Sequence, residues 1–157
     1  MKGKWSSLVI CCAIPLGVGG LSAFLTRQGM ELFEKLAKPP LSPPGWVFPL
    51  AWTVLYLMMG VASWRIWMCG PYHGKRNQAL LLYGVQLAVN FLWPILFFNL
   101  GWFLFALLWL ILLWVLVFRL YFLFRELDPL AGKLLLPYQV WLTFAAYLNL
   151  GIYVLNR

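Results

Sequence analysis

Residues 77–118 read NQALLLYGVQLAVNFLWPILFFNLGWFLFALLWLILLWVLVF, a run of 42 residues without a formal charge. An α-helix rises about 1.5 Å per residue, so one helix over this run would be about 63 Å long. That length is about twice the thickness of the hydrocarbon core of a bilayer. The run therefore predicts two membrane-spanning helices. Asn99 and Gly101 mark the break between them, because both residue types favour tight turns.

Three more uncharged runs predict the remaining spans. They cover residues 5–26, 39–64 and 134–156, and each is as long as the roughly 20 apolar residues that a membrane helix needs. The sequence thus predicts an all-α, polytopic membrane protein with five transmembrane helices in a single domain, residues 1–157. The predicted helices are residues 5–26, 46–68, 78–98, 102–124 and 133–155.

The composition agrees with a membrane location. The chain is 64% hydrophobic and 10% charged, whereas soluble domains are about 45–50% apolar and about 25% charged. Residues 103–117 do not alternate between polar and apolar, as the strands of a membrane β-barrel do. Lys2 and Lys4 before an apolar run imitate a signal peptide. The 22 uncharged residues that follow exceed the usual apolar region of about 7–15 residues, so we expect a retained helix.

The net charge of +8 is explained by basic residues at helix ends, where they set topology and contact lipid headgroups, so we expect no nucleic-acid partner. With a cytoplasmic N-terminus, eight basic residues lie inside and four outside, which favours an N-in, C-out orientation. The inside set is Lys2, Lys4, Arg65, Lys75, Arg76, Arg119, Arg125 and Lys133, and the outside set is Arg27, Lys35, Lys38 and Arg157.

The longest predicted loop, residues 27–45, is interpreted as a stiff strap. It ends in residues 38–45, KPPLSPPG, where four prolines in six residues fix φ and cannot sustain a helix. Residues 30–36 before them are compatible with a short amphipathic helix that points Phe33 and Leu36 towards the bundle.

Groups that carry conventional catalysis are scarce. All acidic residues and the one histidine fall in predicted loops: Glu31, Glu34, His73, Glu126 and Asp128. The three cysteines lack the spacing of metal ligands, so we expect no metal site and no required cofactor. A site inside the bundle would act through shape, aromatic stacking and neutral hydrogen bonds, and whether the protein is an enzyme stays open.

Helical spacing predicts that three helices turn aromatic and amide side chains towards one cavity. Gln86 and Asn90 lie far from either membrane surface, and lipid exposure of these amides would be costly, so they are expected to face inwards with Trp93. Such a cavity suits a flat, hydrophobic, conjugated ligand. The faces are Phe48, Trp52, Tyr56 and Met59; Gln86, Asn90, Trp93 and Phe97; and Trp141, Ala145, Leu148 and Asn149.

An alternative is that the ten tryptophans form interfacial belts or fill the core. Belts explain Trp5, Trp46, Trp64, Trp67 and Trp102 well. They fit the tryptophans inside the spans less well, namely Trp52, Trp93, Trp109, Trp114 and Trp141. The combination of Trp52, Trp141 and the amides of the third helix favours a ligand cavity.

Several blocks resemble the signature of one family, in the same order. They are residues 38–39, residues 43–56 (PPGWVFPLAWTVLY), residues 86–94 (QLAVNFLWP), residues 97–98 and residues 136–149 (LPYQVWLTFAAYLN). The chain resembles the translocator protein family, also called the tryptophan-rich sensory protein or peripheral-type benzodiazepine receptor family. The blocks span nearly the whole chain, and its length is similar to that of bacterial members, which implies the bacterial cell membrane.

The resemblance implies a five-helix bundle that binds porphyrins, notably protoporphyrin IX, and also sterols and isoquinoline or benzodiazepine-type ligands. Trp52 and Trp141 resemble tryptophans implicated in light-dependent porphyrin breakdown. Pocket positions carried over by motif are Pro43, Phe48, Tyr56, Asn90, Trp93 and Ala145, with Phe33 as a cap; Phe97 and Leu148 join them from the predicted faces. The expected function is a tetrapyrrole sensor or regulator, with promotion of light-dependent porphyrin degradation as a further expected activity. The alternative is a transporter or channel-like carrier of porphyrin or sterol.

Further expectations concern charge and assembly. Porphyrin propionates are expected at Lys38 or Arg27, and His73 is badly placed as an axial ligand, which favours a metal-free porphyrin. Leu150, Tyr153 and Arg157 fit a loose sterol-binding pattern, although a location of the Tyr and the Arg at the membrane surface explains them better.

Family members are often dimers, and a homodimer is expected through the small residues Gly84 and Ala88. Packing inside the monomer and the pair Gly19 and Ala23 are the alternatives.

Overall fold

A computed structural model describes residues 2–70 and 73–157 of the chain. Within these residues, five helical segments are long and apolar enough to cross a membrane, which confirms the predicted class of fold. They are α1 (Lys2–Leu25), α3 (Val47–Trp67), α4 (His73–Pro94) continued by the π-helical turn η1 (Ile95–Asn99), α5 (Phe103–Leu127), and α6 (Pro129–Leu134) continued by α7 (Leu136–Leu155). A short helix, α2 (Arg27–Glu34), lies outside the spans.

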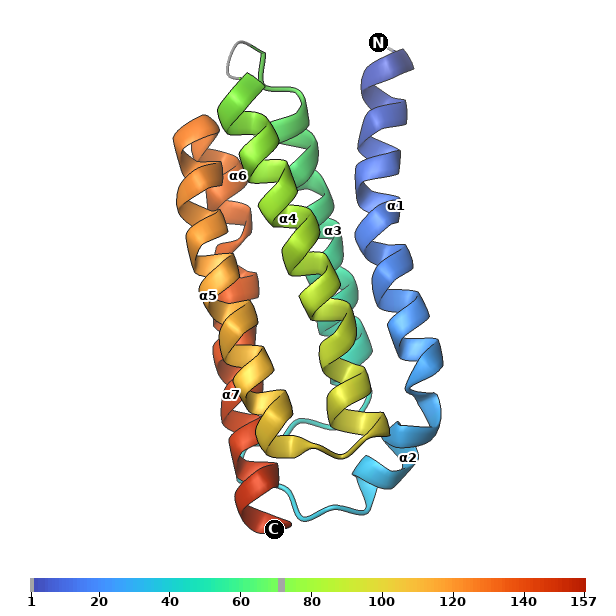
Figure 1. Ribbon diagram of the computed structural model, residues 1–157. Helices are drawn as coiled ribbons and strands as arrows, with labels where there is room; N and C mark the ends of the chain where they lie inside the picture. The colour runs from blue at the N-terminus through green and yellow to red at the C-terminus, as the bar shows by residue number, and fades with distance from the viewer. Residues whose placement is uncertain (1, 71–72) are drawn as a thin grey trace.

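The spans run up and down the bundle in turn (Figure 1). The N-terminal end of α1 and the C-terminal end of α7 therefore lie at opposite ends of the molecule. The short α2 and the segment that follows it lie at the end where α7 finishes. The turn between η1 and α5 lies at this same end and contains Gly101, whose φ of 65° is readily adopted only by glycine. The predicted break between the third and fourth spans is confirmed.

Several helices extend beyond the predicted bounds. For α1 and α3 the observed bounds differ from the predicted ones by at most three residues. The helix α4 begins five residues before its predicted start, at His73. Charge-free runs mark the part of a helix in lipid, whereas the backbone hydrogen bonds continue into the headgroup region. Glu126, which was expected in a loop, therefore belongs to the last turn of α5. Glu31 and Glu34 lie in α2, inside the connecting segment where a short helix was expected.

Asp128 connects the ends of three helices. Its side chain caps α6 by accepting a hydrogen bond from the Leu130 amide at 3.0 Å, and Pro129 follows it in the position that proline favours. Its other oxygen lies 2.6 Å from Nε of Arg65, near the end of α3. Burial alone would raise the pKa of Asp128, but the Arg65 guanidinium and the backbone donors hold that pKa below its ordinary value.

Glycines allow α1 and α3 to approach each other closely. A Cβ atom added to Gly60 of α3 would collide with the backbone at Cys11 and Cys12, and one added to Gly19 of α1 would collide with the ring of Tyr56. Small residues allow this kind of contact between membrane helices. Gly19 thus serves packing inside the monomer.

A chain of polar side chains crosses the core. Tyr56 donates to Oδ1 of Asn90 at 2.9 Å, and Nδ2 of Asn90 donates to the Tyr138 hydroxyl at 2.7 Å. That hydroxyl donates in turn to Oε1 of Gln86 at 2.8 Å. Gln86 and Asn90 are only 0% and 2% exposed, so the prediction that both amides face the interior is confirmed. Because both amide side chains form hydrogen bonds with tyrosine hydroxyls, they can remain buried in an apolar bundle.

Candidate ligand-binding cavity

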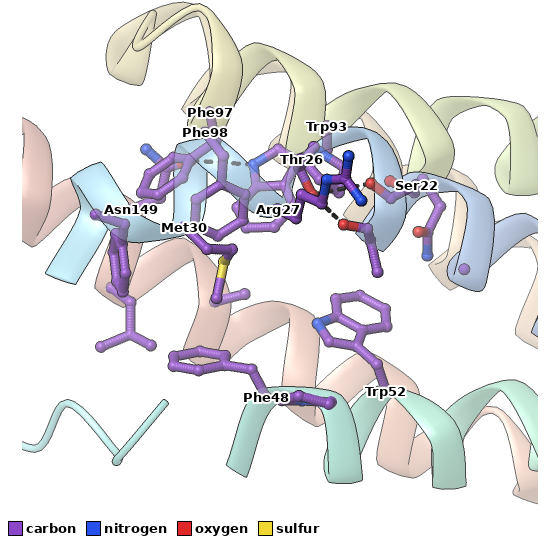
Figure 2. A pocket seen from close by; sticks show the side chains of 18 of the residues that line it. Ser22, Thr26, Arg27, Met30, Phe48, Trp52, Trp93, Phe97, Phe98 and Asn149 are labelled. Atoms are coloured by element: carbon purple, nitrogen blue, oxygen red, sulfur yellow. Dashed lines mark hydrogen bonds between the residues drawn. The ribbon is translucent and has the colours of Figure 1, made fainter. Parts of the chain in front are cut away.

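A cavity of about 340 Å³ is lined by residues of α1, α2, α3, α4, η1 and α7, with α2 at one end of it. This volume is within the range of small-molecule pockets. In Figure 2, Phe48 and Trp52 of α3 face Trp93, Arg27 and Met30 across the open space. The cavity is therefore walled mainly by aromatic and aliphatic side chains from separate helices.

Most of the predicted site residues come together here. The cavity is lined by Phe33, Phe48, Trp52, Tyr56, Asn90, Trp93, Phe97, Trp141, Ala145 and Leu148. Met59 and Gln86 of the predicted faces are not among the lining residues, and neither is Pro43, in contrast to the sequence-based expectation. The strap that carries Pro43 is drawn towards α7, where Pro39 packs on Gly151 and the Tyr147 hydroxyl donates to the Pro40 carbonyl at 2.7 Å.

Sequence reasoning missed the contribution of α1 and the start of α2. Gly19, Ser22, Ala23, Thr26 and Met30 also line the cavity. The helix α1 is apolar almost throughout, so hydrophobicity alone did not single out an inward face. Gly19, Ser22 and Thr26 do recur at i, i+3 and i+7, one side of a helix, and this pattern of small residues was the available signal.

The end of the cavity is closed by an aromatic cluster around Phe33 of α2. Its ring centroid lies 5.4 Å from that of Phe98, 5.8 Å from that of Phe97 and 6.3 Å from that of Phe48. Gly29 allows α2 to sit directly on the backbone of Phe98. The short helix expected near residues 30–36 thus exists at Arg27–Glu34, and Phe33 packs against the bundle as predicted.

Polar groups in the wall mostly bind one another. Trp93 donates through Nε1 to Oδ1 of Asn149 at 3.1 Å, and Nδ2 of Asn149 donates to the Phe103 carbonyl at 2.8 Å. The Ser22 hydroxyl donates to the Phe91 carbonyl at 3.2 Å. These bonds fix the shape of the cavity and leave few polar atoms free inside it.

Arg27 is the only lining residue with a formal charge among those that the structure describes. Its guanidinium carbon lies 4.4 Å above the ring of Phe24, which orients the side chain through a cation–π contact. Lys38 does not line the cavity; its Nζ donates to the Glu34 carbonyl at 2.9 Å and lies over Phe33. Arg27 is thus the cation that an anionic group in the cavity would meet.

Trp141 differs in its hydrogen bonding from three other tryptophans of the spans. Its Nε1 is buried and has no hydrogen-bond partner within the described chain. The indole nitrogens of Trp93, Trp109 and Trp114 instead donate to Asn149, to the Val89 carbonyl and to Thr143. A buried N–H without a partner is costly, so this one is available to an acceptor.

The other predicted features lie on the outside. Trp5, Trp46, Trp67 and Trp102 are more than half exposed, as an interfacial belt requires. Trp64, also expected in the belt, is partly buried and donates through Nε1 to the Ser7 hydroxyl at 3.1 Å. Leu150 and Tyr153 lie on the last two turns of α7 and Arg157 follows it, away from the cavity. Gly84 and Ala88 lie on an exposed face of α4. In the described part of the chain, no three His, Cys, Asp or Glu residues are grouped as metal ligands would be.

Comparison with known proteins agrees with the resemblance found in the sequence. Residues 11–155 match the model of the TspO/MBR family. The chain is 34% identical to the tryptophan-rich protein TspO of Chlorobaculum tepidum, over 99% of both chains. It is 37% identical to the tryptophan-rich sensory protein of Cereibacter sphaeroides, over 99% of this chain and 95% of the relative. It is 35% identical to the translocator protein of Bos taurus, over 100% and 94%. The chain therefore belongs to the TspO/MBR family of membrane proteins.

Proposed function

We propose that this protein binds protoporphyrin IX or a related metal-free tetrapyrrole in the cavity and acts as a membrane sensor or regulator. The observation that carries the proposal is an aromatic cavity inside the bundle with one arginine, Arg27, in its wall. Most of a porphyrin is a flat apolar ring, and its propionates are anionic. The name of the Cereibacter sphaeroides relative, a sensory protein, supports the regulatory part.

The apolar ring and the anionic propionates of the ligand would contact different residues of the cavity. The macrocycle would stack against Trp52 and Phe48 on one side and against Trp93 and Phe97 on the other. A propionate would pair with Arg27 through a charge-assisted hydrogen bond. The unpartnered N–H of Trp141 would donate to a ligand acceptor. Sterol-like, isoquinoline or benzodiazepine-type molecules would compete for the same apolar space.

Binding is tested by the shift of the porphyrin absorption band and by quenching of protein fluorescence in proteoliposomes. The double variant Trp52→Phe plus Trp141→Phe is expected to lose most of the affinity. The matched control is Trp5→Phe plus Trp102→Phe, which removes the same number of indoles from exposed positions away from the cavity. Equal binding by both double variants would remove the cavity from the proposal.

A second activity, light-dependent porphyrin degradation, is favoured by one contact. Trp52 and Trp141 both line the cavity and touch each other edge to face, with ring centroids 6.3 Å apart. Light-excited porphyrin and molecular oxygen would supply the reactivity, and the paired indoles would stabilise or relay a radical. Illumination of the complex in air should give a new absorbing product. If the product also forms without protein, this activity is absent.

A further inference from the structure

The seam between α3 and α7 is open towards the lipid. The backbones of these two helices hardly approach each other, whereas α3 packs against α1 and α6, and α7 packs against α5. An outward-facing groove of about 870 Å³ runs along this seam. It is lined by residues of α3 from Val47 to Met58 and by residues of α7 from Leu136 to Phe144. Every lining side chain is apolar, so the groove forms part of the surface that the hydrocarbon core of the bilayer covers.

One side chain belongs to both the groove and the internal cavity. Trp141 lines each of them, so in this region the wall between lipid and cavity is a single indole thick. The ring is held by aromatic contacts, with centroids 6.0 Å from Phe48, 6.3 Å from Trp52 and 5.6 Å from Phe144. Because its N–H has no partner in the described chain, the indole can turn without breaking a hydrogen bond.

Hydrogen bonds hold the strap, residues 27–45, against the end of α7. At the end covered by α2, the side chain of Asn156 accepts a hydrogen bond from the Ala37 amide at 3.1 Å and donates one to the Ala37 carbonyl at 2.8 Å. Tyr147 adds its bond to the Pro40 carbonyl. Phe33 must also leave its aromatic cluster before this end opens. Lifting the strap from this end therefore breaks several hydrogen bonds, whereas turning the Trp141 indole breaks none.

We propose that the planar, apolar ligand of the cavity enters sideways from the bilayer through the seam between α3 and α7, and that the Trp141 side chain is the gate. This inference rests on the proposed function. The ligand first dissolves in the bilayer, where an apolar ring concentrates, and then lies in the groove. Trp141 swings outwards into the groove, which has room for its ring, the ligand passes, and the indole returns to form the cavity wall.

The test narrows the groove without touching the cavity. Ala51 lines the groove and not the cavity, so Ala51→Phe obstructs the portal alone. Ala13 is an exposed residue of α1, and Ala13→Phe is the matched control. Protoporphyrin IX in phosphatidylcholine vesicles is mixed with proteoliposomes, and the shift of its absorption band is followed in time. Dissociation is followed after adding an excess of empty vesicles.

An obstruction in the groove should slow both entry and exit of the ligand, because both use the same path. Ala51→Phe is expected to lower the association and dissociation rates by the same factor, roughly tenfold, and to leave the equilibrium affinity unchanged. Ala13→Phe should leave both rates as in the wild type. Val140→Phe, an exposed position on the opposite wall of the groove, should repeat the effect of Ala51→Phe and guards against a folding defect.

The outcomes separate the portal from the binding function. Unchanged rates in Ala51→Phe and Val140→Phe, with normal final binding, would show that the groove holds only acyl chains and would overturn the portal. Faster association in Asn156→Ala, which frees the strap, would show that the ligand comes from water instead. Absence of binding by the wild-type protein would overturn the proposed function, and the portal with it.

Discussion

The indole rings of Trp52 and Trp141 meet edge to face, with their planes at 86° and their centroids 6.3 Å apart. The two residues come from α3 and α7, helices whose backbones hardly touch. Aromatic side chains thus bridge a gap that the backbone leaves open, and they separate the internal cavity from the lipid-facing groove. The positions of these two rings therefore shape the part of the cavity wall that faces the groove.

Arg27→Gln should weaken porphyrin binding only when the ligand carries free carboxylates. We expect a loss of affinity of about threefold to tenfold for protoporphyrin IX, because one partly exposed ion pair is lost. The dimethyl ester of protoporphyrin should bind the variant and the wild type equally. Arg157→Gln, which changes an exposed arginine at the other end of the sequence, is the control. An equal loss for the acid and the ester would assign Arg27 a packing role instead.

Tyr138→Phe should destabilise the fold, because Tyr138 accepts a bond from Asn90 and donates one to Gln86. Both amides would then remain buried with an unpaired group, at a cost of about 1–2 kcal/mol in the free energy of unfolding. Thermal unfolding in detergent micelles measures this change. Tyr153→Phe, on the last turn of α7 away from the cavity, should have little effect, and equal melting temperatures for the two variants would contradict the argument.

The ion pair between Arg65 and Asp128 should make stability depend on acid pH. The pKa of Asp128 is lower in the folded protein than the ordinary value of 3.8, so the pair stabilises the fold above that value. This stabilisation disappears as the pH falls through the lowered pKa of the folded state. The melting temperature of the wild type should therefore exceed that of Asp128→Asn at neutral pH, and the two should converge once the pH has fallen below the lowered pKa of the folded state. A constant difference would exclude titration of this carboxyl as its cause.

Gly84→Phe should reduce dimer formation if the exposed face of α4 is the contact between two copies. A Cβ added to Gly84 meets nothing within 4 Å in the single chain, so the variant should fold normally while a bulky ring prevents close approach of a second helix. Crosslinking in native membranes measures the dimer fraction. Gly17→Phe on α1, also exposed and free of neighbours, is the control. Crosslinking that traps only monomers of the wild type would contradict a homodimer.

The sequence by itself determined the class of protein and the inward sides of several helices. Apolar runs of more than 20 residues without a charge are long enough to cross the bilayer, and counting them predicted the number of spans. The depth of Gln86 and Asn90 required both amides to face the interior, because a bilayer offers them no hydrogen bonds. Their spacing then placed Trp93 and Phe97 on the same side. These conclusions follow from constraints that act along one helix.

Only the tertiary structure decided which helices meet and how closely. Three features depend on contacts between residues far apart in the chain: the roles of Ser22 and Thr26 in the cavity, the attachment of the strap to α7 at Pro40, and the open seam beside Trp141. Such contacts are set by where small residues such as Gly19 and Gly60 let backbones approach and where large rings hold them apart. Periodicity within one helix shows which side is buried, but it does not identify the partner, because many neighbours can cover the same apolar face.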